Sequence, residues 1–173
     1  PAQGQLTAPV IRSLLAVALL AVAAPAFAQA DPAAFLAANR ARPGVVETPS
    51  GLQYQILFAG EPGAKPGDDD VALVIYEGKL TSGATFDKSP WATPMPVAAV
   101  VPGFAEAMKL MPSGARYRFW IKPELAYGAD EKKDAAGKTV IPANSILVFD
   151  IRMLDFIPGA TFQALVGGAP SGN

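Results

Sequence analysis

The segment from Ala115 to Lys122, "ARYRFWIK", alternates between two kinds of side chain. One side carries Tyr117, Phe119 and Ile121, and the other carries Arg116, Arg118, Trp120 and Lys122. A period of two is typical of a β-strand that is buried on one face. Charged residues on the second face predict that this face is solvated, which favours an antiparallel sheet over a parallel one.

Other segments complete such a sheet. Residues 52–57 ("LQYQIL") alternate in the same way, and residues 71–80 and 146–154 are strand-like, with "TSGA" at 81–84 as a hairpin loop. Between them, Pro102 and Pro112 enclose one short helix, whose apolar stripe has the spacing i, i+3, i+4, i+7. The stripe consists of Phe104, Ala107, Met108 and Met111. The sequence therefore predicts an α+β fold, an antiparallel sheet curled over a helix.

The N-terminal part has the features of a secretory signal peptide. Arg12 precedes an apolar run from Leu14 to Ala24, and Ala26-Phe27-Ala28 provides an A-x-A cleavage site. An uncleaved membrane anchor is the alternative, but the run is short for a span of about 20 residues. We expect residues 1–28 to be removed near Ala28-Gln29, leaving a periplasmic or secreted protein without a membrane span.

Three further segments follow from local signals. Residues 29–46 form a short helical arm, because Asp31 is a suitable N-cap, Pro32 suits the first helical position, and Pro43-Gly44 ends the helix. Residues 47–157 form the main domain. Residues 158–173, rich in glycine, proline and small side chains, predict a flexible C-terminal tail without regular structure.

The charged residues exclude several classes of function. The chain has 14 Lys+Arg, 15 Asp+Glu, no histidine and no cysteine. This balance provides no basic surface for nucleic acid. Without His or Cys the chain has no disulfide, and we expect no metal and no cofactor. The acidic run Gly67–Asp70 suggests either a cation site or a solvated turn before a strand, and the turn is favoured because no further ligands follow at loop spacing.

Four motifs, in this order, resemble the FKBP-type peptidyl-prolyl cis-trans isomerases, and most closely their bacterial macrophage-infectivity-potentiator branch. They are "SGLQYQIL", "VIYEGKLTSGATFDKS", "VVPGFAEAMKLMPSGARYRFWIKPELAYG" and "IPANSILVFDIRML". The resemblance covers Phe35 to about Ile157. It implies a strongly twisted antiparallel sheet wrapped around one short α-helix, with the active pocket between them.

The resemblance also assigns the site. The catalytic positions fall on Asp87, Tyr127, Phe86 and Phe149, and the substrate-binding positions on Tyr76, Val100, Val101, Phe104 and Ile141. Asp87 would orient and polarise the pocket without acting as a base, and Tyr127 and the Val101 N–H would donate to substrate carbonyls. Two positions depart from the family pattern. Phe104 stands where Trp is frequent, and Met95 is nearest to a position that is commonly aromatic.

The activity implied is isomerisation of X–Pro bonds in exported proteins, assisting their folding. The partners implied are proline-containing unfolded or partly folded clients and macrolides of the FK506 type. Two other interpretations stay open: a binding module or holdase chaperone with the same pocket and little catalysis, and a small β protein that carries an apolar ligand. We expect a monomer, and we expect the loop Ala129–Lys138 to influence client choice.

Overall fold

The computed structural model describes residues 31–167, so the predicted signal peptide lies outside the described residues. One antiparallel sheet has the strand order β1-β2-β6-β9-β3-β4, with β5 also paired to β3. Its strands are β1 Val45–Glu47, β2 Gln53–Phe58, β3 Asp70–Leu80, β4 Thr85–Lys88, β5 Thr93–Pro96, β6 Arg116–Ile121 and β9 Leu147–Pro158. The alternation of apolar and charged residues in 115–122 thus correctly predicted an antiparallel sheet.

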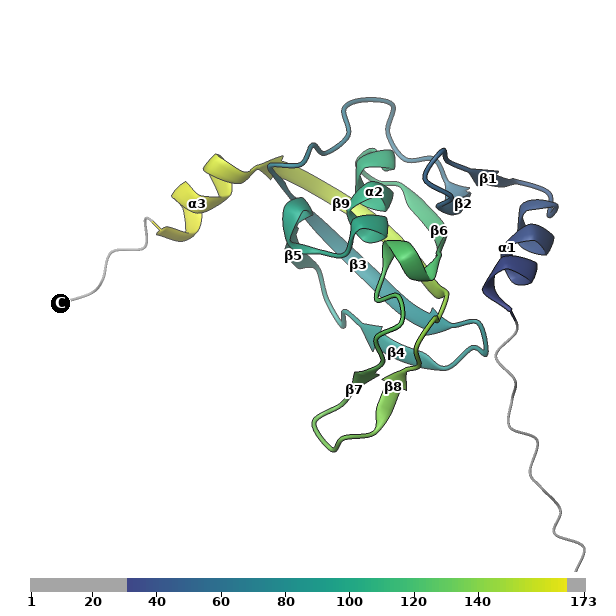
Figure 1. Cartoon of the computed structure of the whole chain (residues 1–173). Coiled ribbons are helices and arrows are strands. Elements are labelled where there is room, and N and C mark those ends of the chain that lie inside the picture. Colours follow the sequence, from purple (N-terminus) through teal and green to yellow (C-terminus); the bar gives the residue numbers. More distant parts are fainter. Residues whose placement is uncertain (1–30, 168–173) are drawn as a thin grey trace, which may run out of the picture.

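Helix α2, Pro102–Leu110, lies across one face of this sheet (Figure 1). Pro102 occupies the first turn, where its missing N–H costs nothing, and Met111 leaves the helix in an extended conformation before Pro112. The predicted apolar stripe is the buried one, since Phe104, Ala107, Met108 and Met111 are all at most 4% exposed. They join the inward side chains of β3, β6 and β9 in one core.

Helix α1, Pro32–Arg40, is docked on the start of the sheet. Asp31 caps it by accepting from the N–H groups of Ala33 and Ala34, as predicted. Its Asn39 is buried and donates to Gln53 at 2.9 Å, and Gln53 donates in turn to Glu47 at 2.7 Å. The hydrogen bond from Gln53, and then that from Arg40, lower the pKa of Glu47. This network fixes α1 against β1 and β2.

Two features differ from the sequence-based expectations. The prediction of an irregular tail is wrong for Gly159–Gly167, which form helix α3 at the end of β9 (Figure 1). Gly159 N–H donates to Asp69 O at 3.0 Å, and Phe162 lies against residues of β3 and β9, so contacts with the sheet, which the local sequence does not reveal, position this helix. Trp120, predicted on the solvated face, is only 4% exposed, because the Arg42 guanidinium lies 5.9 Å from its ring centre.

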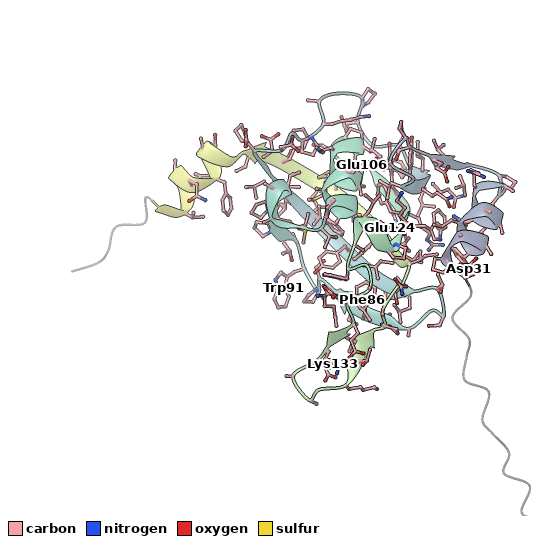
Figure 2. All side chains as sticks on the ribbon, viewed as in Figure 1. Asp31, Phe86, Trp91, Glu106, Glu124 and Lys133 are labelled. Carbon is pink, nitrogen blue, oxygen red and sulfur yellow. The ribbon has the colours of Figure 1, made fainter. Side chains whose placement is uncertain are left out.

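The long segment after β6 contains more structure than predicted. It begins with the 3-10 turn η2, Pro123–Leu125, and continues into a small hairpin, β7 Lys132–Lys133 and β8 Thr139–Ile141. This hairpin projects from the sheet, with Lys133 below Phe86 in the view of Figure 2. A second 3-10 turn, η1 Val97–Ala99, leads into α2.

The acidic run before β3 forms a turn. Asp70 N–H donates to Gly67 O, the Asp70 carboxylate accepts from Gly67 N–H, and Asp68 pairs with Lys109 at 2.7 Å. Within residues 31–167, no helix has the length and apolar character needed to cross a membrane.

Candidate active site

Four aromatic rings from four elements meet between the sheet and α2. Phe149 of β9 is central, with its ring centre 4.9 Å from Phe104 of α2, 5.5 Å from Phe86 of β4 and 6.0 Å from Tyr76 of β3. The Phe104 and Phe86 contacts are nearly perpendicular, at 84° and 89°, which is a favoured edge-to-face geometry. We call Tyr76, Phe86, Phe104 and Phe149 the aromatic cluster.

Gly78 permits this approach of the rings. It is paired across the sheet with both Asp87 and Phe149. A Cβ at this position would stand 2.7 Å from Phe149 Cε1 and 2.7 Å from Phe86 Cζ. Sequence reasoning did not assign a role to Gly78, although a glycine inside a strand is a known signal for close approach of neighbouring groups.

Asp87 is held at the edge of the aromatic cluster. The Tyr76 hydroxyl donates to Asp87 Oδ2 at 2.8 Å. Burial, followed by this hydrogen bond, raises the pKa of Tyr76 to about 12. The phenol therefore stays protonated at neutral pH and acts as the donor, while the second oxygen of the exposed Asp87 carboxylate has no partner within residues 31–167.

Tyr127 and Val101 each provide a hydrogen-bond donor that no other described residue uses. Tyr127 is 36% exposed, and the Lys132 ammonium lies 4.8 Å from its ring centre. Its phenol also contributes electrostatically to the raised pKa of Tyr76. The Val101 carbonyl accepts from Phe104 and Ala105 at the start of α2. Among the described residues, neither the Tyr127 hydroxyl nor the Val101 N–H has an acceptor.

The remaining predicted residues border the same core. Ile141 of β8 is 5% exposed and belongs to the core, and Val100 and Val101 pack against it. Met95 of β5 also packs there, at the position where the family pattern is commonly aromatic. The structure thus brings Tyr76, Phe86, Asp87, Phe104 and Phe149 together from four elements, while Val100, Val101 and Ile141 are part of the same hydrophobic core or pack against it.

One exposed aromatic residue was missed by sequence reasoning. Trp91 lies between β4 and β5 and is 72% exposed (Figure 2). It follows Asp87 by four residues on the segment that leaves β4. A large exposed aromatic side chain on a loop next to a predicted site is a signal that could have been used, because such residues are enriched among binding contacts.

The arrangement limits the chemistry. Within the described part of the chain, no three acidic residues gather in a way that could hold a metal ion. The sequence has no His or Cys, so the site contains neither the usual general base nor a thiol nucleophile. The fold and site define an α+β protein with an aromatic site between one sheet and one helix, suited to binding and to polarising an uncharged group.

A comparison with protein families identifies the family. The model described as FKBP-type peptidyl-prolyl cis-trans isomerase matches residues 63–154, more than half of the chain. The model described as the domain amino terminal to FKBP-type peptidyl-prolyl isomerase matches residues 21–56, which include α1, β1 and most of β2. The chain belongs to the FKBP-type peptidyl-prolyl cis-trans isomerase family, which confirms the resemblance.

Individual relatives agree with this assignment. FKBP-type peptidyl-prolyl cis-trans isomerase FkpA of Aeromonas hydrophila is 43% identical over 123 residues, which cover 69% of this chain and 43% of the relative. Outer membrane protein MIP of Legionella longbeachae is 41% identical over 124 residues, covering 70% and 51%. The chain therefore spans about half the length of these curated relatives.

Solved structures confirm the predicted fold class. The crystal structure of FkpA from Escherichia coli matches with a TM-score of 0.65 and 35% identity, covering 74% of this chain and 58% of that one. The peptidyl-prolyl cis-trans isomerase of Pseudomonas syringae matches with a TM-score of 0.66 and 32% identity, covering 72% and 90%.

Proposed function

We propose that this protein is a peptidyl-prolyl cis-trans isomerase that assists the folding of exported proteins. The observation that carries the proposal is the aromatic cluster with Asp87 held at its edge by Tyr76 at 2.8 Å and with two unused donors nearby. In this proposal the proline ring of a client packs on the aromatic cluster, between Val100 and Val101 on one side and Ile141 on the other.

The chemistry requires no nucleophile. An X–Pro bond isomerises in tens to hundreds of seconds against a barrier of roughly 18–20 kcal/mol, which reflects lost amide resonance. The planar imide is more polar than the twisted one, so an apolar site that removes water favours twisting. Donors that fix the twisted geometry lower the barrier further. Since each ~1.4 kcal/mol gives a factor of ten, about 5 kcal/mol would bring the reaction to milliseconds.

Each predicted residue has a role in this mechanism. Asp87 acts through its field at the twisting carbonyl carbon, and it is kept in place by Tyr76. Tyr127 and the Val101 N–H donate to substrate carbonyl oxygens. Phe86 and Phe149 form the walls of the site and exclude water, and Phe104 forms its floor.

A proline-binding module or holdase is the second candidate. Phe104 and Met95 favour this second candidate. Phe104 stands where the family often has the larger Trp, and Met95 is nearest to a position that is commonly aromatic, so both offer a proline ring less surface to pack on. A third interpretation, a β protein with an apolar ligand inside the sheet, has less support, because α2 covers the inner face of the sheet (Figure 1).

A turnover assay separates the first two candidates. An isomerase accelerates the cis-to-trans conversion of a proline tetrapeptide at catalytic concentrations of protein. A holdase instead suppresses aggregation of an unfolded client at stoichiometric concentrations and leaves the tetrapeptide rate at its uncatalysed value.

The cellular context is part of the proposal. The predicted signal peptide, together with a relative named as an outer membrane protein, supports a location outside the cytoplasm. Proline-containing client segments are the proposed substrates. Binding of FK506-type macrolides and a monomeric state are further proposals, which inhibitor titration and analytical ultracentrifugation test.

A further inference from the structure

The face of the sheet opposite α2 carries its side chains in rows that cross the strands. The core residues Tyr117, Phe149 and Ile151 point toward α2, so their neighbours in the strands point to the outer face. Strand pairing places Phe58 opposite Arg116, Arg116 opposite Arg152, and Arg152 opposite Ile75. We call Phe58, Arg116, Arg152 and Ile75 the arginine row. It has two cations in the middle and an apolar side chain at each end.

The two arginines of this row oppose each other, and no counterion from the described part of the chain pairs with them. Directly opposite like charges destabilise an antiparallel pair. In the next row, Arg118 binds both carboxylate oxygens of Asp150, at 2.6 and 2.7 Å. Among residues 31–167, neither Arg116 nor Arg152 forms an ion pair or a side-chain hydrogen bond.

Glu77, the other nearby carboxylate, is also engaged. It pairs with Lys79 at 2.8 Å and accepts from Thr85 at 3.2 Å. The hydrogen bond from Lys79 is the main cause of its lowered pKa. The carboxylates beside the arginine row therefore do not neutralise it, and the positive charge is left for an external anion.

The arginine row lines a surface groove. The groove has a volume of about 670 Å³, and its lining includes all four residues of the row together with Lys88. Phe58 is 64% exposed although it is a large aromatic residue. Three cations and two apolar surfaces in one open groove match a ligand that carries carboxylates and apolar side chains on one extended chain.

We propose that this groove binds an acidic polypeptide segment, with carboxylates between Arg116 and Arg152 and apolar side chains against Phe58 and Ile75. A protein segment fits better than an anionic membrane. The cations line a groove, which a single extended chain can enter, and the whole chain carries a net charge of −1, which provides no overall attraction for a broad negative surface. Binding here requires no proline, and Tyr76 is the one member of the aromatic cluster that also lines this groove.

The test uses a fluorescein-labelled, proline-free peptide of alternating Glu and Leu, with a Gln-Leu peptide as its uncharged match. Binding is measured by fluorescence anisotropy at low ionic strength, where such contacts are weakly screened. We expect R116Q/R152Q to weaken binding of the acidic peptide by about tenfold or more, which is the scale of a lost charge-assisted contact. K133Q/K138Q removes the same charge from the β7–β8 hairpin and should leave the affinity within about twofold.

Two readouts separate this site from the proposed isomerase site. R116Q/R152Q should keep the tetrapeptide isomerisation rate of the wild type, and Asp87→Ala should keep the affinity for the acidic peptide. Thermal unfolding of R116Q/R152Q should occur at the same or a higher temperature, because a like-charge pair is removed. If the double variant does not fold, Arg152→Gln alone should weaken peptide binding in the same direction.

Several outcomes would overturn the inference. Unchanged peptide affinity in folded R116Q/R152Q or R152Q would do so, as would equal binding of the Gln-Leu peptide. Loss of peptide binding in Asp87→Ala would place the peptide at the aromatic cluster instead. Binding to phosphatidylglycerol vesicles without binding to the acidic peptide would assign the groove to a membrane surface.

Discussion

Asp87 and Phe149 lie within the same site but differ in burial, so their removal should have different effects. Asp87 is exposed, and among the described residues its carboxylate accepts one hydrogen bond, from Tyr76, whereas Phe149 is 6% exposed and contacts three other rings. Asp87→Ala should lower kcat about tenfold, with little change in KM and a stability loss of about 1 kcal/mol or less.

Phe149→Ala is the matched comparison. It opens a cavity in the aromatic cluster and should cost about 3–5 kcal/mol of unfolding free energy as well as activity. Steady-state kinetics and denaturant unfolding of both variants test this. An Asp87→Ala variant that loses as much stability as Phe149→Ala would show that Asp87 has a structural role.

Gly78 gives a second test at the residue scale. Gly78→Ala places a methyl group 2.7 Å from ring atoms of both Phe86 and Phe149, so the two rings must move apart. We expect a stability loss of about 1–3 kcal/mol, typical of overpacking, together with reduced turnover. Gly63→Ala is the control, since a Cβ there meets no atom within 4 Å. Equal melting temperatures for the two variants would contradict the assignment.

At the scale of elements, helix α3 should stabilise the domain through one side chain. Phe162 lines a cleft of about 200 Å³ together with residues of β3 and β9, whereas Leu165 is 69% exposed. Phe162→Ala should lower the melting temperature by about 4 °C, corresponding to about 1 kcal/mol. Leu165→Ala should leave it unchanged. Identical melting curves for both variants would mean that α3 is not docked in solution.

The β7–β8 hairpin should affect client choice more than chemistry. Its tip, residues 134–138, is a turn closed by Asp134, which accepts from the N–H groups of Ala136 and Lys138. Replacing this tip with Asn-Gly keeps Lys132 over Tyr127 and keeps Ile141 in place. Rates on a protein client should change while the tetrapeptide rate is preserved. Parallel losses on both substrates would show that the tip shapes the site itself.

On the scale of the whole molecule, the elements with strong local signals were predictable. The alternation around Phe119 and the proline-bounded stripe of α2 correspond to a buried strand face and a buried helix face. The capping of α1 by Asp31 was also visible in the sequence. These features depend on residues that are close together in the sequence, so the sequence pattern alone is enough to predict them.

Features that depend on distant contacts were not predictable. Trp120 is buried because Arg42, from the segment after α1, covers its ring. Helix α3 has no charged residues and no buried side chain, so its local signal was weak. The arginine row follows from strand register, which brings together residues of β2, β3, β6 and β9. The site residues came from the family resemblance, while their ring geometry and the role of Gly78 came from the structure.

In the proposed mechanism, catalysis proceeds without a titrating acid–base pair. The sequence has no histidine. Since the pKa of Tyr76 is raised to about 12, folding favours its protonated form, and the hydrogen bond to Asp87 is fully present below the ordinary tyrosine value of 10.0 and lost only as the pH rises toward 12.

The most direct measurement is therefore kcat/KM for a proline tetrapeptide between about pH 6 and 8, a range in which Tyr76 keeps its proton. We expect clear acceleration over the uncatalysed reaction and a nearly flat profile across this range. A bell-shaped profile, or a rate equal to that of the uncatalysed reaction, would contradict the proposed mechanism.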